Sequence, residues 1–184
     1  MQIIFQKEIR AVAPALCCLL LTSLLLSCEN VQAAEKFKPF KLRTLDGTTK
    51  TLQDFANKAT LIAFYYPSCA YCNLALPEIL KIYYKYKDQG LSWVIINVKT
   101  EENKLIAGWQ GKYNIAVPIL IGASQNSLID DYHLTMTPTH YLLGKKGEVL
   151  LRQNGYNRGD EKIIEAKVAE ALNVGLEPET PEKK

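Results

Sequence analysis

Two cysteines, Cys69 and Cys72, stand three positions apart in the sequence Cys-Ala-Tyr-Cys. Thiols at this spacing can close a small disulfide ring and open it again by exchange. The thiolate is the reactive form, and the N-terminus of a helix favours such an anion. A thiolate at Cys69 would attack a substrate disulfide and form a mixed disulfide, which Cys72 would then resolve. The pattern therefore predicts thiol–disulfide exchange.

The same pair has two inert interpretations, half of a zinc site or a structural disulfide. Structural zinc takes four ligands, and the sequence has no second Cys-x-x-Cys pair. Its two histidines, His133 and His140, lie at separations unlike those of a zinc finger. We therefore expect no metal and no cofactor, because two sulfur atoms carry the electrons. Each histidine could tune the reactivity of nearby thiols. In the simpler interpretation, His133 is an ordinary loop residue and His140 is a strand residue whose hydrogen bonds are satisfied.

A second motif, Thr137-Pro138-Thr139, lies at the start of a predicted strand. Proline avoids strand interiors because it has no N–H to donate to a neighbouring strand. If Pro138 faces the cysteines, we expect a cis peptide bond before it, which would expose neighbouring backbone groups to an extended substrate. An ordinary trans proline at a strand entrance is the alternative.

The cysteine pair stands where an apolar strand ends and a helix begins. Residues 60–66 are almost wholly apolar, as is typical of a buried strand. Residues 69–88 carry apolar side chains, Leu74 among them, at helical spacing, and Gly90 ends this run. Pro77 lies inside the helix, where we expect a kink.

The other predicted elements alternate between strands and helices. They are a hairpin around Asp46-Gly47, a helical turn at 52–57, strands at 91–98, 117–121, 139–143 and 149–153, and helices at 101–113, 128–132 and 160–172. This order predicts an α/β fold, with a mixed sheet flanked by helices on both faces and an N-terminal β-hairpin extension.

The composition is globular, with 48% hydrophobic and 22% charged residues among 184. The net charge is +3 and no basic patch stands out, so we expect no nucleic-acid partner.

Residues 1–27 resemble a signal peptide, because a basic start precedes an uncharged run that is shorter than the roughly 20 residues of a spanning helix. Leu25-Leu26-Ser27-Cys28 resembles a lipobox, in which Cys28 is acylated, whereas Val31-Gln32-Ala33 resembles an ordinary cleavage site. An uncleaved anchor is the third possibility. Each predicts an exported protein, periplasmic or otherwise extracytoplasmic, in a compartment that permits disulfides.

The predicted organisation has four parts. Residues 1–27 are the signal peptide, residues 28–36 a polar tether, residues 37–174 the folded domain, and residues 175–184 a flexible polar tail.

The cysteine pair after an apolar strand, Pro77 five residues beyond Cys72, and Thr137-Pro138 before a strand hairpin together resemble the thioredoxin superfamily. Over about residues 37–173 the chain is similar to exported TlpA-like and ResA-like thiol–disulfide oxidoreductases, within the redoxin group that includes AhpC/TSA proteins. The resemblance implies a thioredoxin-like fold, Cys69 as nucleophile, and Cys72 as resolving thiol. It also implies that Thr137 and Pro138 form a substrate-facing loop.

The chain departs from this pattern at several positions. Ser68 replaces the usual aromatic residue, Ala63 a buried acid of many thioredoxins, and Ala75 a glutamate of ResA-like proteins. Both usual proton acceptors for the buried thiol are therefore replaced, which leaves Glu78 or a bound water as candidates. Between the cysteines, Tyr71 either shades Cys69 or contacts substrate, or it is an ordinary surface aromatic residue.

The leading functional hypothesis is an exported, membrane-tethered oxidoreductase that reduces disulfides of exported proteins. The resemblance adds apocytochrome c as a possible substrate, and such a reductase needs electrons from a membrane thiol donor. A thiol peroxidase is one alternative, although Tyr66 stands where peroxiredoxins carry threonine or serine. A redox-inert binding module is another, and the intact cysteine pair argues against it. A DsbA-like oxidase would need a larger helical insertion than residues 101–113.

Overall fold

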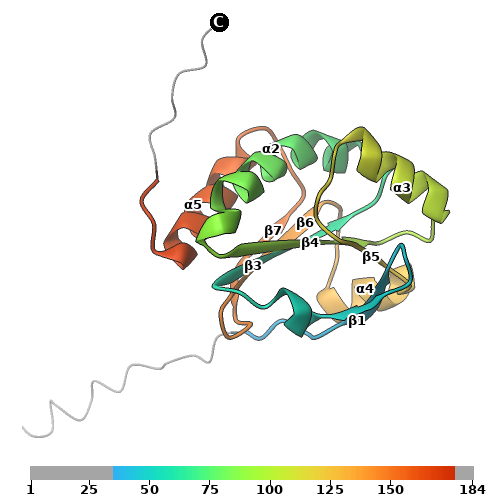
Figure 1. The fold of residues 1–184 in the computed structure, drawn as a ribbon, viewed down its shortest axis with the longest axis horizontal. Helices are drawn as coiled ribbons and strands as arrows, with labels where there is room; N and C mark the ends of the chain where they lie inside the picture. The colour runs from blue at the N-terminus through green and yellow to red at the C-terminus, as the bar shows by residue number, and fades with distance from the viewer. Residues whose placement is uncertain (1–34, 177–184) are drawn as a thin grey trace, which may run out of the picture. The chain divides into compact units, whose positions relative to one another are not determined.

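The strand that leads to the cysteine pair is an interior strand of a seven-stranded sheet (Figure 1). The computed structural model describes residues 35–176. The strands are β1 (Lys41–Thr44), β2 (Thr49–Thr51), β3 (Ala59–Tyr65), β4 (Leu91–Asn97), β5 (Ile119–Ile121), β6 (Thr139–Gly144) and β7 (Val149–Asn154). The helices are α2 (Ala70–Tyr86), α3 (Asn103–Lys112), α4 (Gln125–Tyr132) and α5 (Asp160–Leu172), with short 3-10 helices η1 (Leu52–Phe55) and η2 (Lys87–Gln89).

The strand order is β2-β1-β5-β4-β3-β6-β7, with β3, β4 and β5 parallel and the remaining pairs antiparallel. Figure 1 shows α2, α3 and α5 on one face of the sheet and α4 on the other. The predicted mixed sheet with an N-terminal hairpin is therefore confirmed. The hairpin is part of the sheet itself, because β1 pairs with β5 and Arg43 lies opposite Ile121.

Alternate residues of β3 face two separate cores, because successive side chains of a strand point to opposite faces. Ala63 and Tyr65 belong to the core that also holds Cys72 of α2. Ile62 and Phe64 belong to the other core, which is rich in aromatic side chains. This alternation places Tyr65 on the face of the sheet that α2 covers.

Helix α2 begins directly after Cys69 and ends earlier than the predicted 69–88. It stops at Tyr86 and continues as η2, after which Gly90, at a φ of 111°, turns the chain into β4. A Cβ atom at Gly90 would be strained at that φ and would come within 2.8 Å of the Lys58 side chain. Leu74, expected on the apolar face, is 36% exposed, so its predicted burial was wrong.

Two other boundaries differ from the prediction for local reasons. Helix α4 begins at Gln125 rather than 128, because the Ser124 hydroxyl accepts a hydrogen bond from the Ser127 backbone N–H and caps the helix. Strand β5 begins at Ile119 rather than 117, after Pro118, which has no N–H to pair.

The start of the fold also differs from the predicted domain boundary. Glu35 and Lys36 were expected in the tether, but the Glu35 carbonyl accepts a 2.8 Å hydrogen bond from the Val149 N–H, and Lys36 bridges to Glu148. The predicted signal peptide, Cys28 and residues 177–184 of the tail lie outside the described residues. Within residues 35–176, no helix is long and apolar enough to cross a membrane.

Candidate active site

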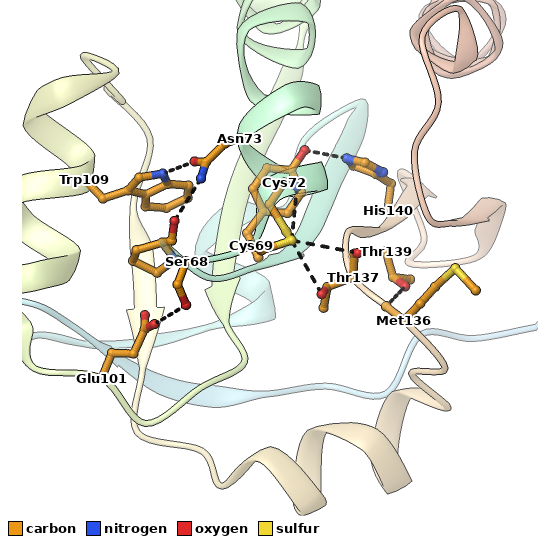
Figure 2. Close-up of a disulfide and its surroundings, with 12 residues drawn as sticks. Ser68, Cys69, Cys72, Asn73, Glu101, Trp109, Met136, Thr137, Thr139 and His140 are labelled. Carbon is orange, nitrogen blue, oxygen red and sulfur yellow. Dashed lines mark hydrogen bonds between the residues drawn. A yellow bond between two sulfur atoms is a disulfide. The ribbon is translucent and has the colours of Figure 1, made fainter.

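Cys69 and Cys72 form a disulfide at the first turn of α2 (Figure 2). Their Cα atoms lie 5.2 Å apart. Cys69 occupies the N-cap position, where its sulfur accepts a 3.1 Å hydrogen bond from the Cys72 backbone N–H. In the reduced protein, this N–H and the aligned peptide dipoles of α2 would favour a negative charge on the Cys69 sulfur.

The two sulfur-bearing residues differ in their access to solvent. Cys69 is 4% exposed, whereas Cys72 has no exposed surface. A substrate disulfide can therefore approach only Cys69. Cys72 is placed to attack the Cys69 sulfur from the interior of the protein, because the two sulfurs already form a disulfide in the structure.

The loop before β6 faces the Cys69 sulfur, and Figure 2 shows Thr137 beside it. The Thr137 carbonyl oxygen and hydroxyl oxygen lie 3.9 and 3.7 Å from that sulfur. The Thr137–Pro138 peptide bond is cis, as expected. Thr137, which lies 68 positions beyond Cys69 in the chain, thus meets the disulfide, which is the arrangement that a substrate-facing loop requires.

Tyr71 points outward between the two cysteines, and its side chain is 60% exposed. An exposed ring of this kind is available to a partner protein. Its role in substrate binding stays a prediction.

A polar network that the sequence analysis missed fixes the turn between β3 and α2. The Asn73 amide donates a 2.9 Å hydrogen bond to the Pro67 carbonyl and accepts a 2.7 Å bond from the Trp109 indole N–H. Ser68 donates a 3.2 Å bond to Glu101. No motif in the sequence pairs Trp109 with Asn73.

An apolar hollow of about 570 Å³ lies next to this turn. Its lining residues are Pro67, Ser68, Glu102, Lys104, Leu105, Gly108, Trp109 and Lys112. Because Ser68 directly precedes Cys69, the hollow adjoins the disulfide and could hold part of a bound protein.

The two histidines occupy different environments. His133 is exposed at the end of α4, where its carbonyl accepts a hydrogen bond from Arg152, so the simple loop interpretation holds. His140 is fully buried on β6, and its Nε2 lies 2.7 Å from the Tyr65 hydroxyl. Its Nδ1 is buried without a partner, so the expectation of a satisfied strand histidine was wrong for this atom.

Glu78, one of the proton acceptors left open by the sequence, forms a 2.9 Å ion pair with Lys81 on the outer side of α2. Its carboxylate is engaged at the surface. Among residues 35–176, no three side chains of the types that bind metals come together.

The comparisons with known proteins agree with this geometry. The Redoxin family matches residues 32–171. The chain belongs to the redoxin family. It is 27% identical over 124 residues to the thiol-disulfide oxidoreductase ResA of Halalkalibacterium halodurans, which covers 67% of this chain and 69% of that protein. It is 30% identical over 122 residues to the thioredoxin-like protein YneN of Bacillus subtilis, covering 65% of this chain and 70% of the relative.

Solved structures share the fold. A putative thiol:disulfide interchange protein DsbE from Chlorobium tepidum has a TM-score of 0.69 at 21% identity, covering 76% of this chain and 96% of that one. The Sco-family protein BsSco, described as a cytochrome c oxidase assembly protein with a disulfide switch, has a TM-score of 0.62 at 18% identity, covering 78% and 96%. The family and the Cys69–Cys72 pair together identify a TlpA/ResA-like thiol–disulfide oxidoreductase of the thioredoxin superfamily.

We predict that His140 makes the protein sensitive to acid. Burial lowers the pKa of His140 from 6.5 to about 3, because it disfavours the charged imidazolium, and nearby Asp160 only partly opposes this. Below pH 6.5 the unfolded chain therefore binds a proton that the folded protein excludes. The free energy of unfolding should fall by about 1.4 kcal/mol for each pH unit below this value, down to about pH 3. Urea unfolding at pH 7, 6 and 5 measures this slope.

Two variants isolate the contribution of this residue. His140→Gln removes the titration and should flatten the slope between pH 6 and 5. His133→Asn is the matched control, because asparagine tolerates the left-handed conformation at that position (φ 50°), and it should leave the slope unchanged. An unchanged slope in a folded His140→Gln protein would contradict the prediction.

Proposed function

We propose that this oxidoreductase is exported, is tethered to a membrane, and reduces disulfides in other exported proteins. The observation that carries the proposal is the asymmetry of the cysteine pair. Cys69 lies at a helix N-terminus against the Thr137-Pro138 loop, while Cys72 is enclosed behind it. One sulfur is arranged to meet a substrate and the other to release it.

The reaction has two exchange steps. The Cys69 thiolate attacks one sulfur of the substrate disulfide, forms a mixed disulfide, and expels the other substrate sulfur as a thiolate. The Cys72 thiolate then attacks the Cys69 sulfur, reforms the Cys69–Cys72 bond, and expels the second substrate thiolate. Two electrons pass from enzyme to substrate, so a membrane thiol donor must reduce the pair before the next cycle.

The surface around Cys69 supports recognition of an extended polypeptide. The Thr137 carbonyl lies 3.9 Å from the Cys69 sulfur, and an extended substrate segment could pair with the Thr137 backbone. The Pro138 carbonyl already accepts a hydrogen bond from the Gly155 N–H. Tyr71 and Met136, which are 60% and 53% exposed, add apolar area on either side. Such a surface suits cysteine-containing segments of unfolded exported proteins, and apocytochrome c is one candidate.

The sequence supports export. The N-terminal 27 residues have the pattern of a signal peptide, followed by Cys28 in a lipobox-like sequence. Acylation of Cys28 would hold the domain at the membrane surface.

Substitution of the resolving cysteine should trap the substrates. In Cys72→Ser, Cys69 still attacks, but the mixed disulfide is not resolved, so covalent adducts with exported cysteine-pair proteins should accumulate. Purification without reductant, followed by mass spectrometry of the proteins that dithiothreitol releases, identifies them. Cys69→Ser is the matched control and should trap none. The substrate proposal is wrong if the two variants yield the same adducts.

The tether is tested at Cys28. Cells fed an alkynyl palmitate should label the protein, and Cys28→Ser should abolish the label because the acylated sulfur is gone. Cys18→Ser, which changes a cysteine inside the predicted signal peptide, should remain labelled. A mature N-terminus at Ala34, or absence of label on the original protein, would rule out the lipoprotein form.

A further inference from the structure

The apolar hollow of about 570 Å³ next to the β3–α2 turn lies close to any polypeptide that reacts with Cys69. Ser68, which lines the hollow, directly precedes Cys69, and an extended chain advances about 3.3 Å per residue. A substrate segment bound at the Cys69 sulfur therefore passes the hollow within a few residues of its own cysteine. Figure 2 shows Ser68 and Trp109 on the side of Cys69 opposite to Thr137, so the hollow is separate from the loop before β6.

Two walls of the hollow are held together by one side chain. Asn73 donates a 2.9 Å hydrogen bond to the Pro67 carbonyl and accepts a 2.7 Å bond from the Trp109 indole N–H. Pro67 belongs to the β3–α2 turn and Trp109 to α3, so these bonds tie the turn to the helix. The Trp109 ring also contacts Tyr65 and Tyr113, whose ring centroids lie 6.4 and 6.3 Å away. Walls fixed in this way lower the cost of ordering the site when a ligand binds.

The third wall of the hollow is a stripe of α3. Leu105, Gly108, Trp109 and Lys112 follow one another at helical spacing, and all four line the hollow. Glycine destabilises a helix interior, and a Cβ atom added at Gly108 would meet nothing within 4 Å beyond the adjoining helix backbone. Packing therefore does not require this glycine, whereas its missing side chain keeps the hollow open. Leu105 is 51% exposed, which leaves an apolar side chain in water at the rim.

The charges at the rim favour an acidic partner. Lys104 and Lys112 are exposed and line the hollow together with one carboxylate, that of Glu102. Within residues 35–176, neither lysine takes part in an ion pair. The preceding carboxylate, that of Glu101, lines a different hollow and accepts a hydrogen bond from Ser68. The two lysines are therefore available to a carboxylate of a bound polypeptide.

We propose that the hollow binds a large apolar side chain of the substrate polypeptide, within two residues of the reacting cysteine and next to an acidic residue; the inference rests on the proposed function. The apolar side chain packs between Pro67, Leu105 and Trp109, and its burial removes apolar surface from water. The rim lysines face the neighbouring carboxylate. The volume lies in the range of ligand sites, roughly 300–1,000 Å³. The hollow thus selects among exported cysteine-pair proteins before exchange begins.

Peptides of defined sequence test this assignment. Each carries one cysteine joined in a mixed disulfide to 2-nitro-5-thiobenzoate, with Phe-Glu, Ala-Glu or Phe-Lys placed directly before or after the cysteine. The full chain, with Cys17, Cys18 and Cys28 replaced by serine, is reduced and freed of reductant. Attack of Cys69 on the peptide sulfur expels the coloured thiolate, and Cys72 then expels the peptide thiolate as the Cys69–Cys72 disulfide reforms.

The second-order rate constant of colour release measures the preference. In at least one of the two placements, the Phe-Glu peptide should react about 10-fold faster than the Ala-Glu peptide, because only the phenyl ring fills the hollow. The Phe-Lys peptide should react about threefold more slowly than the Phe-Glu peptide at low salt, because lysine meets the rim lysines.

Two matched pairs of variants locate the preference in the hollow. Gly108→Phe fills the hollow and should abolish the preference for phenylalanine. Gly111→Phe places the same ring at a glycine of α3 that does not line the hollow, and should keep it. Leu105→Ser should weaken the preference, and Ile163→Ser, which changes an equally exposed residue of α5, should not. Thermal unfolding establishes that each variant is folded, and the Leu105 and Ile163 pair decides the matter if Gly108→Phe does not fold.

Equal rates for the Phe-Glu and Ala-Glu peptides in both placements would overturn the inference, as would a preference that folded Gly108→Phe retains. Equal rates for the Phe-Glu and Phe-Lys peptides would overturn the acidic neighbour. A dimer of the original protein that Gly108→Phe dissociates in sedimentation would assign the hollow to a second copy of this chain instead. Absence of colour with every peptide would contradict the proposed function itself.

Discussion

The hydrogen bond from the Cys72 N–H to the Cys69 sulfur fixes the position on which the chemistry depends. It makes Cys69 the cap of α2, so the nucleophilic sulfur lies where the helix leaves its N–H groups without partners. The cap holds only while β3 and α2 meet at a fixed angle. Packing of α2 on one face of the sheet, together with the Asn73 bonds to Pro67 and Trp109, maintains that angle.

The same packing creates the difference between the two sulfurs. Packing of the inner side of α2 against the sheet leaves Cys69 barely exposed and Cys72 wholly enclosed. The alternation of β3 and its registry with β6 bring Tyr65 and His140 to the side of the sheet that α2 covers. The site is thus a consequence of how one strand divides its side chains between two cores.

Local patterns predicted much of this arrangement. The bounds of α5, at 160–172, follow from its apolar spacing, and the β3–α2 junction follows from an apolar run that meets Pro67. The cis bond before Pro138 was predicted from the position of the proline at a strand entrance facing the cysteines. In each case the determining residues lie close together in the sequence.

Features that depend on pairing between distant segments could not be predicted in this way. The contact of β1 with β5, the bond between Asn73 and Trp109, and the placement of His140 opposite Ala63 all depend on sheet registry or helix packing. A shift of one residue in the registry of β6 would turn His140 to the other face. The sequence thus identified the cysteines that exchange electrons but not the network of Asn73 and Trp109 that holds the turn beside them.

The most direct test of the account is the reduction potential of the Cys69–Cys72 pair. The full chain, with Cys17, Cys18 and Cys28 replaced by serine so that only this pair reports, is equilibrated in graded dithiol buffers and alkylated. The account predicts a reversible two-electron couple near or below about −230 mV, as expected of a reductant. A potential near about −120 mV would mark a disulfide-forming oxidase, and absence of a reversible couple would contradict the redox function itself.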